Sequence, residues 1–229
     1  MFYDIEKAIE DCENSPSMLF EAIKMNYREV YEKVFEKDNF NFNLTDEDND
    51  NILMRLVKNK DYDLISKYVT NENIDINHQN NDGDTLMHLL VTVNYIDIKD
   101  ILDKILQRSD FLPNIKNNNN ETILDKSLNN HYLYTTMKIL EDNRFNDINL
   151  YSFKNLYEAF IKNNEYGTYS KLNNYTVIFN NLKKKTLKPT MSKLIKLLKR
   201  EDKIIREDFY KLKTDCLDII INHLIKETI

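Results

Sequence analysis

The feature of this sequence that most constrains its fold is a short pattern that returns at a nearly constant interval. In each copy a Ser, Asn or Gly residue stands shortly before an apolar stretch with helical periodicity. These anchor residues are spaced 34, 34, 37 and 35 residues apart, and they are Ser15, Asn49, Gly83, Asn120 and Asn155. Such a period predicts an array of stacked units, because one unit of this length cannot bury its apolar face alone.

A second pattern recurs in step with the anchors. Short polar segments that contain Asn follow the second helix expected in each unit, at Asn41-Phe42-Asn43, Asp75-Ile76-Asn77, Pro113-Asn114 and Asp147-Ile148-Asn149. Two independent patterns in one register favour a true structural repeat over chance.

The residue types at these positions have a local physical reason. A turn that needs a positive φ accepts Gly without steric cost and Asn better than other residues, so we expect Asn to replace the missing glycines. Just after the turn, Thr85, Thr122 and Ser17 are expected to cap the free amides at the start of a helix. The apolar faces of one helix pair are expected to comprise Leu53, Leu56, Val57, Leu64, Ile65 and Tyr68.

The clearest unit resembles the ankyrin repeat. Gly83, Thr85, Leu86, Met87 and His88 fall on the Gly-x-Thr-Pro-Leu-His positions of that family, with Leu86 where proline is usual. The family histidine hydrogen-bonds the neighbouring turn, and the resemblance implies the same role for His88.

The resemblance covers about residues 12–165. It implies an all-α fold, with an ankyrin-like helical repeat solenoid over residues 1–165. Residues 166–229 are expected to add C-terminal helices, which are either degenerate repeats or a cap that covers the apolar side of the last unit. Because one anchor glycine remains and the Thr-Pro dipeptide is lost, we expect irregular units, above all between Gly83 and Asn120.

The sequence lacks the common signatures of catalytic and metal sites. With only Gly83 and Gly167, no Gly-rich phosphate loop can form, and no Gly-x-Ser-x-Gly turn occurs. The four histidines show no metal-ligand spacing, and Cys12 and Cys216 are interpreted as free thiols. We therefore expect a non-catalytic protein without a cofactor.

One acidic segment partly matches a calcium-binding loop. Asp46, Asp48 and Asp50 alternate like the first ligands of an EF-hand, but the required glycine and glutamate positions hold Asn51 and Val57. An acidic loop between two repeats is the better interpretation.

The resemblance also implies a partner-binding surface, since ankyrin stacks bind through their concave side, formed by loop tips and the first helices. Transferred by register, that surface comprises Glu47, Asp48, Asp50, Lys58, Asn59, Asn81, Asp82, Asp84, Thr92, Asn118, Asn119, Glu121 and Asn129. These positions are mostly polar and acidic, which favours a basic protein partner.

The charge distribution leaves a nucleic-acid partner as the alternative. The net charge is −6, yet residues 1–80 hold 18 acidic and 9 basic side chains, whereas residues 181–213 hold 4 acidic and 12 basic ones. Basic helices of this kind can contact phosphates. The candidate contacts are Lys183, Lys184, Lys185, Lys188, Lys196 and Arg200.

The N-terminal segment has no apolar run of signal-peptide length, and no stretch approaches the roughly 18 apolar residues of a membrane span. An intracellular, cytoplasmic location without membrane contact is expected. Asparagine accounts for 32 of 229 residues, which is typical of an AT-rich genome such as that of a large DNA virus, an amoeba or an intracellular parasite. For a viral protein the expected location is the host cytoplasm.

Overall fold

The structure is a computed structural model that describes residues 4–130 and 133–145. This part of the chain contains nine α-helices and no β-strand, so the all-α prediction is confirmed for it. None of the helices found there is long and apolar enough to cross a membrane. The chain divides into two compact units, Met1–Ile123 and Leu124–Ile229, which are described separately.

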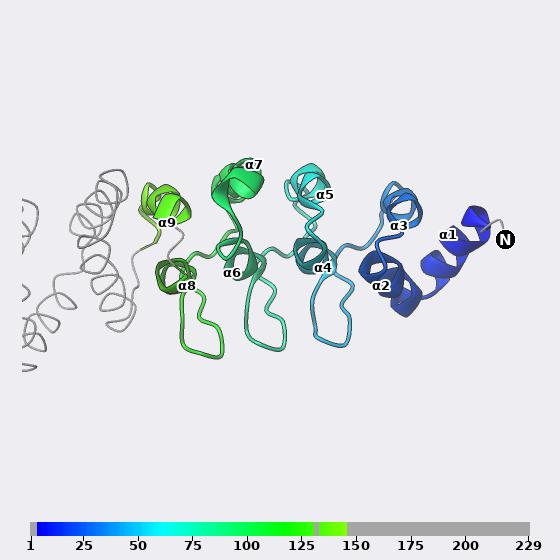
Figure 1. The fold of residues 1–229 in the computed structure, drawn as a ribbon, viewed down its shortest axis with the longest axis horizontal. Helices are drawn as coiled ribbons and strands as arrows, with labels where there is room; N and C mark the ends of the chain where they lie inside the picture. The colour runs from blue at the N-terminus through cyan, green and yellow to red at the C-terminus, as the bar shows by residue number, and fades with distance from the viewer. Residues whose placement is uncertain (1–3, 131–132, 146–229) are drawn as a thin grey trace, which may run out of the picture. The chain divides into compact units, whose positions relative to one another are not determined.

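The first unit opens with three helices, α1 (Ile5–Asn14), α2 (Pro16–Lys24) and α3 (Arg28–Phe35). Asp4 caps α1 by accepting a hydrogen bond of 3.2 Å from the Lys7 amide. Contacts join α1 to both α2 and α3, so α1 covers the N-terminal end of the first helix pair (Figure 1).

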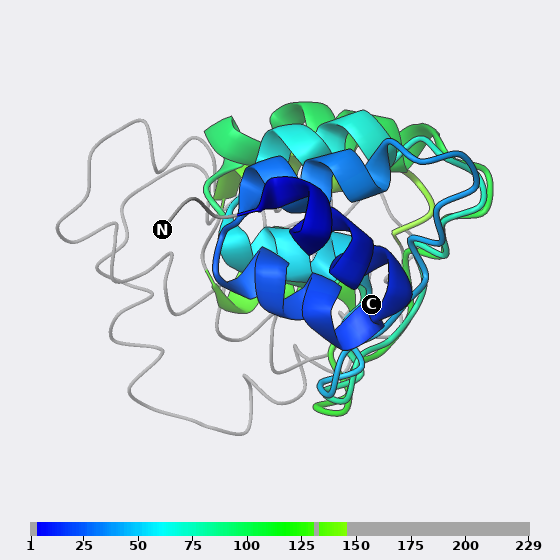
Figure 2. The same ribbon diagram turned by 90° about the vertical axis from the view of Figure 1, so that its right-hand side faces the viewer.

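Two further helix pairs follow, α4 (Ile52–Asn59) with α5 (Tyr62–Tyr68), and α6 (Leu86–Leu90) with α7 (Tyr95–Gln107). Figure 1 shows α2, α4 and α6 in one row and α3, α5 and α7 in a second row. The pairs are in contact along these rows, α2 with α4, α4 with α6 and α5 with α7. Seen along the rows in Figure 2, the helix pairs overlie one another.

Three long loops of the first unit project to the same side of the helix rows, and we name them fingers (Figures 1 and 2). Finger 1 comprises residues 41–51, finger 2 residues 75–85 and finger 3 residues 111–122. Fingers 1 and 2 lead into α4 and α6. No finger precedes α2, because Ser15 alone separates it from α1.

The second unit contains α8 (Ile123–Asn129), which starts at the last residue of the first unit, and α9 (Leu133–Leu140). The buried Thr136 hydroxyl donates to the Ser127 hydroxyl at 3.1 Å, and Ser127 donates to the Leu124 carbonyl at 2.9 Å. These bonds offset the cost of burying the two hydroxyl groups.

The core of the first unit consists of the inward faces of the helices. The predicted apolar faces are confirmed, except that Tyr68 stays partly exposed. Burial of each large aliphatic side chain contributes about 1.5–3 kcal/mol. The fully buried members of the predicted set are Leu53, Leu56, Leu64 and Ile65, and Val57 is nearly so.

A polar link joins α3 to α5 inside this apolar packing. The Tyr31 hydroxyl donates to the buried Asp61 carboxylate, and Arg28 Nη1 lies 3.6 Å from Asp61 Oδ1. Burial and the hydrogen bond to Asp61 raise the pKa of Tyr31. Tyr31 therefore remains a donor at neutral pH, and the Asp61 carboxylate is satisfied within the stack.

The predicted turn conformation is confirmed at three of the anchors. Asn49, Gly83 and Asn120 have φ values of 58°, 73° and 59°. Ser15, the other anchor in the described residues, has an extended φ of −140°, because it joins two helices directly. Asn155 lies outside the described residues, as does the whole of the predicted C-terminal extension.

The helix caps agree with the prediction in part. Thr85 caps α6 by accepting from the His88 amide, and Asn51 caps α4 by accepting from the Met54 amide at 3.0 Å. Ser17 is no cap, since α2 already begins at Pro16, the residue type favoured at a first helical position. Capping by Thr122 stays a prediction.

We predict that Gly83→Ala lowers the free energy of unfolding by about 2–3 kcal/mol. A Cβ at this position would lie 2.6 Å from Asn118 Oδ1 and 2.7 Å from Asn118 N, so it would clash with finger 3 in addition to straining the backbone. Urea unfolding of the full chain measures the change. Asn120→Ala is the matched control, because Asn120 has a similar φ, and this substitution is expected to cost only about 1 kcal/mol. Equal losses in the two variants would show that the close approach of Asn118 to Gly83 adds nothing to the cost.

Candidate functional site

Each finger is closed by the same turn. Asp46 Oδ1 accepts from the amides of Asp48 and Asp50, both at 3.0 Å. Asn80 Oδ1 accepts in the same way from Asp82 and Asp84, also at 3.0 Å. In finger 3, Asn117 repeats the arrangement with Asn119 and Glu121. The side chain thus replaces missing backbone partners, and each tip has a defined conformation.

Consecutive fingers are joined at their tips by two bonds each. The Asn81 amide donates to the Asp48 carbonyl at 2.9 Å, and Asn81 Nδ2 donates to the Glu47 carbonyl at 3.0 Å. Between fingers 2 and 3, the Asn118 amide donates to the Asp82 carbonyl at 3.0 Å, and Asn118 Nδ2 to the Asn81 carbonyl at 2.8 Å. These two bonds are therefore repeated at both junctions.

Buried side chains make a further equivalent bond below the tips. Asn80 Nδ2 donates to Asp50 Oδ1, and Asn117 Nδ2 donates to Asp84 Oδ1, both at 2.8 Å. Asp50 and Asp84 are only 0% and 6% exposed. Their predicted role in partner contact is thereby corrected, since both carboxylates hold neighbouring fingers together.

The bases of the fingers are joined by asparagine side chains as well. Asn43 donates to the Asn73 carbonyl at 2.7 Å and accepts from the Asp75 amide at 2.9 Å. Asn77 makes the corresponding pair of bonds with Asp110 and Leu112, at 2.7 and 2.9 Å. An amide group can donate and accept at once, which explains why Asn recurs at these positions.

His88 connects the start of α6 to the next finger, as the sequence predicts. Its Nδ1 accepts from the Thr85 amide at 3.1 Å, so Nε2 carries the proton and donates to the Glu121 carbonyl at 3.2 Å. The side chain is fully buried. These bonds give it a structural role.

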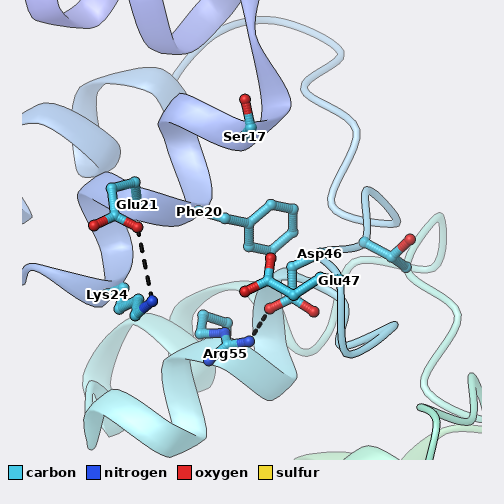
Figure 3. A pocket seen from close by; sticks show the side chains of 8 residues that line it. Ser17, Phe20, Glu21, Lys24, Asp46, Glu47 and Arg55 are labelled. Atoms are coloured by element: carbon cyan, nitrogen blue, oxygen red, sulfur yellow. Dashed lines mark hydrogen bonds and ion pairs between the residues drawn. The ribbon is translucent and has the colours of Figure 1, made fainter.

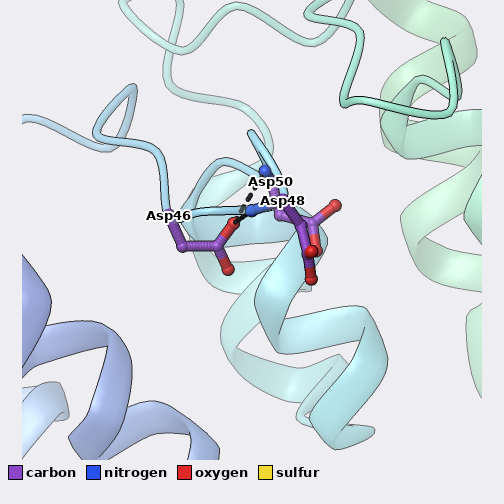
Figure 4. A group of neighbouring side chains, drawn as sticks. All are labelled: Asp46, Asp48 and Asp50. Carbon is purple, nitrogen blue, oxygen red and sulfur yellow. Dashed lines mark hydrogen bonds between the residues drawn. The ribbon is translucent and has the colours of Figure 1, made fainter.

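One carboxylate oxygen from each of Asp46, Asp48 and Asp50 lies within 4.8 Å of the other two. Figure 4 shows these three neighbouring side chains. Two cationic side chains from α4 already pair with this cluster. Arg55 Nη2 pairs with Asp46 and lies 3.2 Å from Asp48 Oδ2, and Lys58 Nζ pairs with Asp50. Because Arg55 and Lys58 take up the oxygens that a Ca²⁺ ion would need, the residues do not fit a calcium site.

Arg55 is held charged in this cluster. Burial disfavours its charged form, but the hydrogen bond to Asp46 and the attraction of Asp46 and Asp50 outweigh burial and raise the pKa of Arg55. The expected acidity of finger 1 is therefore partly balanced within the protein.

The remaining predicted contact residues differ in exposure. Asn59 and Thr92 are half-buried and donate to the carbonyls of Ile23 and Leu89. Asn129 lies in the second unit and is not placed relative to the fingers. The exposed members at the tips are Glu47, Asp48, Asn81, Asp82, Asn118 and Asn119, whereas Glu121 is half-buried.

A pocket of about 300 Å³ lies between α2 and finger 1 (Figure 3). Figure 3 shows Phe20 directed from α2 toward the finger, near Asp46 and Glu47. The lining residues are Ser17, Phe20, Glu21, Lys24, Thr45, Asp46, Glu47 and Arg55. The four from α2 were missed by the sequence analysis, although the spacing of 34 residues pairs Glu21 with Arg55 and Lys24 with Lys58.

The predicted nucleic-acid contacts lie outside the described residues. This applies to Lys183, Lys184, Lys185, Lys188, Lys196 and Arg200.

Comparison with known proteins adds little. No family model matches the chain, and no curated protein matches it. A solved structure titled "Bd0816 Predatory Endopeptidase from Bdellovibrio bacteriovorus in complex with immunity protein Bd3460" is similar over 78% of this chain and 96% of that chain, with a TM-score of 0.43 and 16% identity. At that TM-score the similarity carries no argument.

We predict that Asn117→Asp lowers the free energy of unfolding by about 3 kcal/mol at pH 7. The new carboxylate would stand beside buried Asp84, at the 2.8 Å contact now made by an amide, and near Glu121. Since like charges raise the pKa of such a group in the folded state, the loss should shrink as pH falls toward 4 and grow as pH rises. Urea unfolding at several pH values measures this.

Asn71→Asp is the matched control for that substitution. Asn71 precedes finger 2, and its Oδ1 accepts from the Asn73 amide at 3.0 Å. In finger 2, Asp75 Oδ1 accepts from the Asn77 amide at 2.9 Å in the same kind of turn. A carboxylate is therefore tolerated in this turn, and little change is expected. Similar losses in both variants would contradict the role assigned to the Asn117 amide.

Proposed function

We propose that this chain is an ankyrin-like helical repeat solenoid and a non-catalytic interaction module that binds a protein partner through its fingers and the adjoining inner helices. What supports the solenoid is the recurrence of one helix pair and one finger at a spacing of 34 to 37 residues in the first unit. The same bonds recur at both junctions between fingers.

The observation that carries the binding function is the order of the exposed finger tips. Binding through loops normally costs the free energy of ordering them, about 0.5–1.5 kcal/mol for each immobilised side chain. Here each tip is closed by its own Asp or Asn side chain and tied to its neighbour by Asn81 or Asn118. The tips are therefore ordered in advance, which lowers the cost of binding.

The charge of the exposed tips supports a basic partner. Asp48 is paired with Arg55 and Lys58, and Asp50 and Asp84 are buried. Among the described residues at the finger tips, Glu47 and Asp82 are exposed carboxylates that make no ion pair. These two side chains are the charges that a Lys- or Arg-bearing partner would meet.

The chemistry of the fingers supports a non-catalytic role. Acid–base catalysis needs a titratable group that can reach a substrate proton. The buried carboxylates of Asp50 and Asp84 instead accept from neighbouring asparagines, and buried His88 is bonded at both ring nitrogens.

We predict that Glu47→Lys/Asp82→Lys reduces the amount of captured partner about tenfold, because two favourable charge contacts become repulsive ones. The immobilised full chain is exposed to an extract of cells that express it, and retained proteins are quantified by mass spectrometry. Both substituted side chains are exposed, so the helical circular dichroism should not change.

The matched control is Asp38→Lys/Glu72→Lys. It makes the same change in net charge at exposed residues outside the finger tips. The control should retain the wild-type set of proteins. If the finger variant retains that same set in the same amounts, the finger face is not the binding surface.

A further inference from the structure

Finger 1 is the first finger of the row, and its sequence differs where a preceding finger would meet it. Asn80-Asn81 and Asn117-Asn118 occupy equivalent positions in fingers 2 and 3, and Asp46-Glu47 occupies them in finger 1. The asparagines donate to the finger before them. Carboxylates cannot donate in that way, so the first finger presents acceptors where the others present donors.

We name the side of finger 1 where a preceding finger would lie the free edge. Its backbone keeps a hydrogen-bond donor, the amide of Glu47. The amides of Asn81 and Asn118 each donate to the carbonyl of the preceding finger. The equivalent amide of Glu47 has no acceptor within the part of the chain that the structure describes. A bound chain can therefore repeat here the backbone bond that joins fingers 1 and 2.

The space beside the edge is shaped for a side chain. The pocket between α2 and finger 1 has a volume of about 300 Å³, and the Phe20 ring lines it (Figure 3). The exposed carboxylates of Glu21 and Glu47 stand at this pocket. A volume of this size accepts one apolar side chain, and the Phe20 ring offers it an apolar contact.

The charges at the pocket favour a cationic occupant. Arg55 is already held by Asp46 and Asp48. Lys24 lies 3.9 Å from Glu21, and both side chains are more than half exposed, so this pair is weak. Two carboxylates against one ammonium leave a net negative rim that attracts Lys or Arg.

We infer that an extended, basic segment of the partner protein binds along the free edge of finger 1, in the place of a preceding finger. A backbone carbonyl of the segment accepts from the Glu47 amide, a Lys or Arg contacts Glu21 and Glu47, and a neighbouring apolar side chain enters the pocket against Phe20. This inference rests on the proposed function and narrows it to one edge and one kind of peptide.

The test uses a displayed library of random 12-residue peptides, selected on the full-length protein. Selected peptides should carry Lys or Arg beside an apolar residue. They should bind Glu21→Lys/Glu47→Lys at least about tenfold more weakly than wild type in fluorescence anisotropy, and bind Asp82→Lys as tightly as wild type. In two-dimensional NMR, the Glu47 amide should shift downfield on binding, as expected of a new hydrogen bond.

Three results would overturn the inference: selection of acidic or uncharged peptides, unchanged affinity for the Glu21/Glu47 variant, or the absence of any selected peptide. Unchanged urea midpoints show that the variants are folded, as expected for exposed positions. If peptides bind but are lost with Asp82→Lys instead, the edge assignment fails while the proposed finger-face function stands. If no peptide binds and cell capture is also unaffected by the finger variant, both fail.

Discussion

The bonds between consecutive fingers are the interaction on which the rest of this structure depends. Each junction combines a backbone amide, a side-chain amide at the tip and a buried asparagine–aspartate contact. These bonds require the fingers to approach closely, and that approach explains why Gly83, next to Asn118, has no side chain. They also require groups that donate and accept together, which explains asparagine at many finger positions independently of genome composition.

The same interaction decides which charges are available to a partner. Carboxylates that face a neighbouring finger, Asp50 and Asp84, are used inside the stack. At the first finger no earlier finger is present, and Arg55 pairs with Asp46 in its place. Fewer acidic side chains are therefore available to a partner than the sequence contains. The binding surface that we propose is concentrated at the exposed tips and at the edge of finger 1 beside α2.

The local features of the fold could be predicted from the sequence, because they depend on neighbouring residues. A positive φ at Asn49, Gly83 and Asn120 follows from residue type, and the buried helix faces follow from periodicity. Ser15 fits the spacing of the repeat but forms no such turn, because a helix directly precedes it.

The candidate site was harder to predict, since its contacts join residues far apart in the sequence. The bond from Asn80 to Asp50 spans 30 residues, and that from Asn117 to Asp84 spans 33. Burial of an aspartate in this way depends on how closely neighbouring units approach in space. The pattern of residue types along the sequence does not contain that distance. The pocket beside α2 depends on the absence of a finger, which no single motif marks.

Hydrogen exchange of individual backbone amides tests the central claim most directly. If the fingers are held together as described, the amides of Asn81 and Asn118 exchange slowly, because opening them requires separating neighbouring fingers. The amide of Glu47, at the equivalent position without an acceptor, exchanges close to the rate of an unstructured chain. Exchange of Asn81 and Asn118 as fast as that of Glu47 would contradict the account.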